Sequence, residues 1–136
     1  MTVNEVVYFL NHKHGECAYI IQEGRELVIY TARSKWRIML DDFSRFNTYT
    51  LIHSNHKADV GFFHKQCTSA NLDYLVYYAV THDLDNIEYD WREFKRLWEM
   101  YKLGRELEES CSQFAFLCGE DWWLTKGEEY ENRSNW

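Results

Sequence analysis

Hydrophobic and polar positions change their period about halfway along the chain, and the first half has the pattern of β-structure. Two runs of β-branched and aromatic residues, Cys17–Gln22 and Glu26–Thr31, flank a turn centred on Gly24. This pattern predicts a β-hairpin in which Gly24 takes a positive φ. Val3–Leu10 fits either a strand or a short helix. Further strands are predicted at Trp36–Leu40, Thr48–His53 and, from a weaker pattern, Asp59–His64.

The second half follows the period of α-helices. A helix is predicted from Leu72 until the polar segment that begins at Asp83. Asp90 is followed by an acid at the spacing of a capping box, which opens a long helix predicted to run to about Glu109. A second capping spacing predicts a separate short helix over Ser110–Gly119. The aromatic face of the long helix is expected to be core: Trp91, Phe94, Leu97, Trp98 and Tyr101. Its other face carries expected ion pairs: Glu88/Arg92, Lys95/Glu99 and Lys102/Glu106.

Strands first and helices afterwards are typical of an α+β fold. We expect an N-terminal antiparallel sheet of about four or five strands, followed by about three C-terminal helices packed on one face. The length of 136 residues and the absence of a Gly/Ser linker predict a single domain over 1–136, β-rich in 1–67 and helical in 68–136.

Composition places the chain among folded cytoplasmic proteins. Hydrophobic residues make up 46% and aromatic residues 18%, which is far from the composition of a disordered chain. No apolar run approaches the length of a membrane span, and no secretory signal is recognisable at the N-terminus. We therefore expect no membrane contact, and we expect the four cysteines, which include no CxxC pair, to stay reduced.

Candidate chemistry is sparse. His53 and His56, with His64 and Cys67, have residue types that zinc favours, but the pairs lie closer together than in usual zinc fingers. Surface imidazoles beside a buried thiol explain them better, so no metal and no cofactor are expected. No nucleophile with an orienting base and no phosphate-binding glycine loop is recognisable, so we expect a protein that is not an enzyme.

Charge is the most informative feature, because it is concentrated at one end. Residues 106–136 hold eight acids and two bases, against a net charge of −7 for the whole chain. Acids beside aromatic residues suit a surface that binds a basic protein, where charge steers association and apolar side chains anchor it. The expected partner-binding residues are Glu106, Glu108, Glu109, Glu120, Asp121, Trp122, Trp123, Glu128, Glu129 and Glu131.

These observations favour a non-enzymatic, stoichiometric inhibitor. Its expected target is a nucleic-acid-handling enzyme such as a host defence nuclease, whose basic groove an acidic surface can occupy as a DNA mimic. Size and composition resemble those of phage-encoded inhibitors, in which case the protein acts in the host cytoplasm. Three alternatives stay open. One is a toxin-neutralising immunity protein. Another is a nucleic-acid-binding module on the mildly basic, His-rich N-terminal sheet, which requires a contiguous basic face. The third is a small enzyme, which requires a concave pocket lined by His and Asp or Glu side chains.

Overall fold

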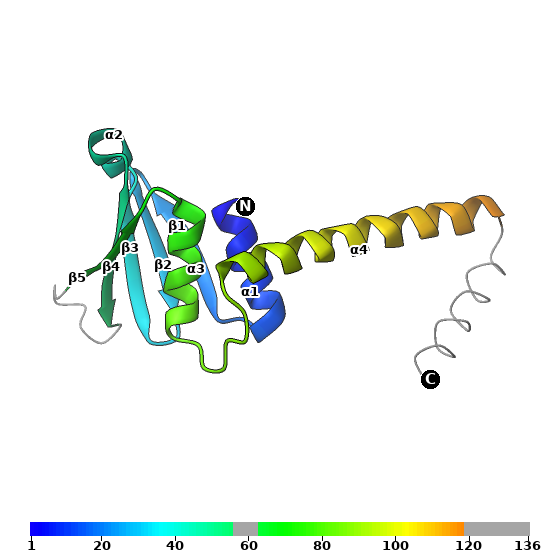
Figure 1. The fold of residues 1–136 in the computed structure, drawn as a ribbon, viewed down its shortest axis with the longest axis horizontal. Helices are drawn as coiled ribbons and strands as arrows, with labels where there is room; N and C mark the ends of the chain where they lie inside the picture. Colours follow the sequence, from blue (N-terminus) through cyan, green and yellow to red (C-terminus); the bar gives the residue numbers. More distant parts are fainter. Residues whose placement is uncertain (56–62, 119–136) are drawn as a thin grey trace. The chain divides into compact units, whose positions relative to one another are not determined.

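The structure is a computed structural model that describes residues 1–55 and 63–118. The chain divides into two compact units, residues 1–93 and residues 94–136, and each is described by itself. The described residues have an α+β fold (Figure 1). In chain order the elements are α1 (Val3–His14), β1 (Ala18–Glu23), β2 (Glu26–Thr31), β3 (Ser34–Met39), α2 (Asp42–Phe46), β4 (Tyr49–Asn55), β5 (His64–Ser69), α3 (Leu72–His82) and α4 (Trp91–Cys118).

The five strands form one antiparallel sheet in the order β1-β2-β3-β4-β5, so each strand pairs with its neighbour in sequence. The predicted hairpin is confirmed: Glu23 pairs with Glu26, and Gly24 has a φ of +61°. The strands predicted over Trp36–Leu40 and Thr48–His53 correspond to β3 and β4. The strand predicted over Asp59–His64 lies mostly outside the described residues, and β5 begins at His64, the last residue of that prediction.

Helices α1 and α3 cover one face of this sheet, which we call the inner face (Figure 1). Helix α1 packs beside α3 and against β1, while α3 packs against β2, β4 and β5. Alternate strand residues point toward the helices and contribute to the core between them. The large hydrophobic side chains that are fully buried on the sheet and on the two helices are Ile29, Trp36, Ile38, Leu51, Val6, Leu10, Leu75, Val76 and Val80.

The helices are not confined to the C-terminal half, which corrects the predicted order. Val3–Leu10 belongs to α1, which precedes the sheet. Its start is set by a capping box: Glu5 N donates to Thr2 Oγ1 at 3.1 Å, and Thr2 N donates to Glu5 Oε1 at 2.8 Å. The short helix α2 lies between β3 and β4. The described residues therefore contain four helices rather than three.

Helix α4 is continuous from Trp91 to Cys118, so the prediction of a separate helix starting at Ser110 was wrong. The predicted start is confirmed, because Glu93 N donates to Asp90 Oδ1 at 2.8 Å. Trp91, in the first unit, packs against Tyr77 of α3 with ring centres 5.1 Å apart. No helix among the described residues has the length and apolar character that a membrane crossing needs.

Candidate protein-binding surface

Three of the predicted partner-binding residues lie on α4. Glu106, Glu108 and Glu109 are all exposed there, within the second unit. The other predicted residues lie outside the described part of the chain: Glu120, Asp121, Trp122, Trp123, Glu128, Glu129 and Glu131. The described part of the predicted surface is therefore the stretch of α4 around the first three acids.

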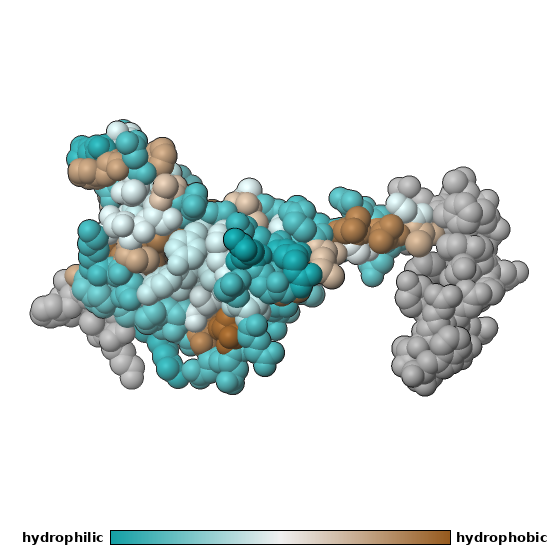
Figure 2. Space-filling view, viewed as in Figure 1, coloured by the Kyte–Doolittle hydropathy of each residue, from teal (hydrophilic) through white to brown (hydrophobic). Residues whose placement is uncertain are grey.

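This stretch carries an exposed apolar stripe that the sequence analysis missed. The side chains of Met100, Leu103 and Leu107 are 56%, 56% and 57% exposed. Their spacing of three and then four residues puts them on one face of α4. Figure 2 shows hydrophobic side chains on this part of α4. We call these three residues the α4 stripe. The spacing of the stripe is visible in the sequence, but only the aromatic face of the same helix was recognised there. Phe94 and Trp98 of that aromatic face are buried.

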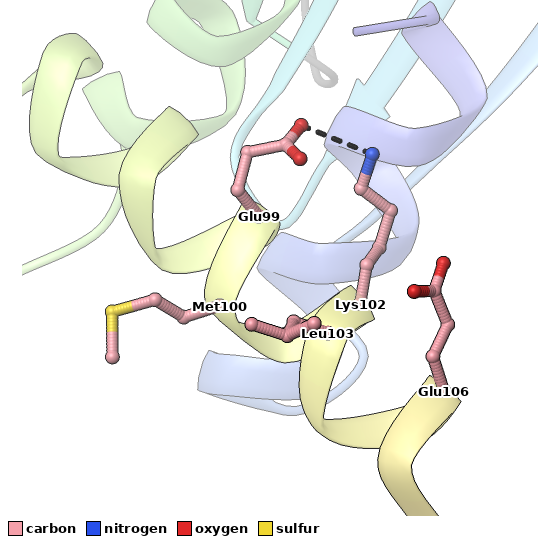
Figure 3. Close-up of a pocket in the computed structure, with 5 residues that line it drawn as sticks. All are labelled: Glu99, Met100, Lys102, Leu103 and Glu106. Atoms are coloured by element: carbon pink, nitrogen blue, oxygen red, sulfur yellow. Dashed lines mark ion pairs between the residues drawn. The ribbon is translucent and has the colours of Figure 1, made fainter. Parts of the chain in front are cut away.

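Charged side chains border the α4 stripe. Met100 and Leu103 extend to one side of the helix, while Glu99, Lys102 and Glu106 point to an adjacent side (Figure 3). These five residues line a shallow hollow of about 330 Å³. Lys102 Nζ lies 3.0 Å from Glu99 Oε1, so this lysine pairs with Glu99 rather than with Glu106 as predicted. The carboxylate of Glu106 therefore adds negative charge to the lining of the hollow.

Helix stability does not explain the acids. Glu106 and Glu109 are three residues apart, and like charges at that spacing destabilise a helix by a few tenths of a kcal/mol. From Glu106 to Cys118 the sequence holds three acids and no base. The last turn of α4 also lacks the basic residue that would favour a helix C-terminus. Together with the exposed stripe, this concentration of charge has the character of a binding surface.

A second constellation, of three histidines, lies on the inner face of the sheet in the first unit. His53 Nε2 is 2.8 Å from Ser34 Oγ, and His53 Nδ1 is 3.3 Å from His64 Nε2. His82, at the end of α3, has its ring centre 5.4 Å from that of His53. The ring of the fully buried Trp36 lies against His53 with centres 4.1 Å apart. Sequence spacing gave no sign of His82, because the fold brings it in from α3.

Asp83 completes this cluster. Its Oδ2 accepts a hydrogen bond of 2.6 Å from Thr31 Oγ1, and its Oδ1 is 3.2 Å from His82 Nδ1. Burial acts to raise the pKa of Asp83, but hydrogen bonds from Thr31, Ser34 and His82 outweigh burial and lower it. Burial lowers the pKa of His53, and the neighbouring His64 and His82 lower it further, against the pull of Asp83. The cluster therefore favours a neutral His53 next to an ionised Asp83.

The arrangement of this cluster suits a structural role. Ser34 and His53 contain the atoms of a nucleophile and a base, but Ser34 is only 1% exposed, so a substrate has no approach to its hydroxyl. Of the four residues considered for zinc, only His53 and His64 come together; Cys67 pairs with Leu51, and His56 lies outside the described residues. Among the described side chains, no three His, Cys, Asp or Glu residues are placed to hold a metal ion.

Comparison with known proteins does not add an identity. No family model matches the chain, and no curated protein or solved structure matches it either.

Proposed function

We propose that the chain is a protein-binding inhibitor that acts without a catalytic step, through the α4 stripe and the acids beside it. One observation supports this proposal above the others: Met100, Leu103 and Leu107 are each more than half exposed on the same helix as Glu106, Glu108 and Glu109. Burial of apolar side chains provides affinity in protein interfaces, and hot spots cluster where water is excluded. The stripe is suited to supply that part of the binding energy.

The acids define which partner the stripe accepts. Helical spacing places Glu106 and Glu108 on the two sides of the stripe and Glu109 on the far side of the helix. Carboxylates near an apolar centre raise the rate of association with a basic partner and disfavour acidic ones. Enzymes that handle nucleic acids carry basic grooves that bind phosphates. A defence nuclease is therefore our proposed target, with the acids of α4 occupying part of its phosphate-binding groove. The same surface would serve a toxin-neutralising immunity protein, and the identity of the bound protein separates the two.

The test uses three variants of the full chain. The stripe variant carries Leu103→Gln and Leu107→Gln, which keep good helix-forming residues. The charge variant carries Glu106→Gln, Glu108→Gln and Glu109→Gln. The control variant removes three exposed acids elsewhere, with substitutions Glu16→Gln, Glu23→Gln and Glu88→Gln. Each immobilised protein is incubated with extract of its native host, and retained proteins are identified by mass spectrometry.

We expect one basic protein to be retained by the wild type and the control variant and lost from the stripe variant. For the purified partner, calorimetry should show affinity about tenfold lower for the charge variant at low salt, with the difference shrinking as salt rises. The nuclease activity of the purified partner should fall in proportion to added wild-type protein until one equivalent is bound. Equal retention by the wild type and the stripe variant contradicts a role for the α4 stripe. A variant with Glu120, Asp121, Glu128 and Glu129 neutralised extends the test beyond the described residues.

A further inference from the structure

The outer face of the sheet carries a row of aromatic and basic residues. Tyr19 on β1 pairs with Tyr30 on β2, and Tyr30 pairs with Lys35 on β3. Because successive side chains on a strand point to opposite faces, Lys35 lies on the face opposite the buried Trp36. The register therefore places Tyr19, Tyr30 and Lys35 side by side across three strands.

The side chains in this row contact one another. The rings of Tyr19 and Tyr30 are stacked, with centres 4.7 Å apart and planes 17° from parallel. Lys35 Nζ lies 5.6 Å from the centre of the Tyr30 ring. The Tyr19 side chain is 56% exposed, so the stack ends in an open aromatic surface. A hollow of about 480 Å³ borders the two tyrosines at the end of β1 and β2, where Asn11, Glu16 and Thr31 also line it.

A second row lies beside the first. Arg37 pairs with Ile52, and Ile52 with Lys65, so two more bases share the outer face. Lys35 and Arg37, two residues apart on β3, are about 6.8 Å apart along the strand. The guanidinium of Arg37 lies 4.9 Å from the centre of the Phe63 ring and donates to Glu26 Oε2 at 2.8 Å. Arg37 and Phe63 therefore form a second pair of a cation and an aromatic ring, like Lys35 and Tyr30 in the first row.

The acids of this face gather at one end, where Glu23 and Glu26 face each other beside the hairpin turn. The hydrogen bond from Arg37 is the main cause that lowers the pKa of Glu26, which keeps this carboxylate ionised and offsets the charge of Arg37. Positive charge is thus left at Lys35 and at Lys65, away from the hairpin turn. Flat rings beside separated ammonium groups complement a chain that alternates bases with phosphates.

A peptide that adds as an extra strand does not fit this face. β-Augmentation takes place at an open edge of a sheet, whereas Tyr30 and Lys35 lie on β2 and β3, whose backbone groups are bonded to strands on both sides. We infer that the outer face of the sheet binds single-stranded nucleic acid, with a base stacked on Tyr19 and backbone phosphates at Lys35 and Lys65. This function is separate from the proposed inhibitor function of α4.

The experiment measures fluorescence anisotropy of labelled oligothymidylate and oligouridylate of about 12 nucleotides at about 20 mM salt. For two phosphate contacts we expect the logarithm of the association constant to fall with the logarithm of salt with a slope of about −1.4, and Lys35→Ala should reduce that slope by about 0.7. Tyr19→Ala should weaken binding about five- to a hundredfold, which is the usual effect of removing one base–aromatic stack.

Two substitutions are matched controls. Tyr8→Ala removes another exposed tyrosine, 47% accessible on α1, and Lys95→Ala removes an exposed lysine of α4; both should bind as the wild type does. The inference is overturned if the folded wild type binds neither oligonucleotide, if Tyr19→Ala binds as well as Tyr8→Ala, or if a duplex of equal length binds as tightly. The stripe variant should retain oligonucleotide binding, so failure of this inference and failure of the α4 proposal give different results.

Discussion

Large apolar side chains have opposite environments in the core of the first unit and in the α4 stripe of the second. In residues 1–93, Trp36, Ile38 and Leu75 are fully buried between the sheet and its helices. In α4, the three side chains of the stripe are more than half exposed. Burial of the first set follows from folding alone, because apolar surface leaves water wherever the chain allows it. Folding does not explain why the three neighbouring side chains of the α4 stripe stay exposed, whereas binding of a partner protein would explain it.

The largest expected difference between the two regions is in how much a truncated side chain lowers the free energy of unfolding. Trp36→Ala should lower the free energy of unfolding by about 3–5 kcal/mol, because it leaves a large cavity in the core. Leu107→Ala should change it by less than about 0.5 kcal/mol, since the leucine is exposed and alanine is an excellent helix former. Urea unfolding followed by far-UV circular dichroism measures both. A cost above about 2 kcal/mol for Leu107→Ala would mean that the side chain is packed.

The histidine cluster predicts a smaller effect that depends on pH. Because the pKa of His53 is lowered in the folded protein, the unfolded chain binds more protons as the solution is acidified. The contribution of neutral His53 is therefore present above the ordinary histidine pKa and is lost as pH falls from about 7 to about 5. We expect the unfolding free energy to decrease over this window, and to decrease less in His53→Gln. Identical pH profiles for the two proteins would refute this assignment.

Local patterns predicted much of the sheet and the starts of α3 and α4, because these depend on neighbouring residues. The hairpin followed from two apolar runs around Gly24, and Asp90 gave a correct N-cap for α4. The ambiguity at Val3–Leu10 could have been settled by Thr2 and Glu5, which have the capping-box spacing that the structure uses. A similar capping-box spacing at Ser110 gave the wrong prediction of a new helix there, because α4 continues through this position.

Tertiary features were less accessible to sequence reasoning. The strand β5 is mostly polar and lies at the edge of the sheet, so it lacks the alternation that marks a half-buried strand. The sequence grouped His53 and His64 only within a zinc candidate that also contained His56 and Cys67. His82 and Asp83 approach the two histidines only because α3 packs on the sheet. The α4 stripe has a helical spacing, yet whether such a face is core or surface depends on what covers it.

Glycine substitutions should have opposite signs in the two regions. Gly104 lies inside α4, and an added Cβ would meet no atom within 4 Å apart from the adjacent helix backbone, so Gly104→Ala should stabilise the helix by about 0.5–1 kcal/mol. Amide hydrogen exchange around residue 104 should slow about two- to fivefold if those amides exchange through local opening. Gly15 has a φ of +79°, where alanine is strained, so Gly15→Ala should destabilise the first unit. Faster exchange in Gly104→Ala would show that this position of α4 is crowded.

The smallest effect concerns Lys102, whose removal should lower the stability of the helix but raise its affinity for a basic partner. Lys102→Gln removes the 3.0 Å ion pair with Glu99, which should cost about 0.2–0.5 kcal/mol of helix stability at low salt and less at high salt. The same change leaves the acids beside the α4 stripe more negative, so affinity for a basic partner should rise a few-fold through a faster association rate. Stopped-flow association with the captured partner checks this. A slower association rate would mean that the ammonium of Lys102 itself contacts the partner, and that the hollow between Glu99 and Glu106 binds an acidic group rather than a basic one.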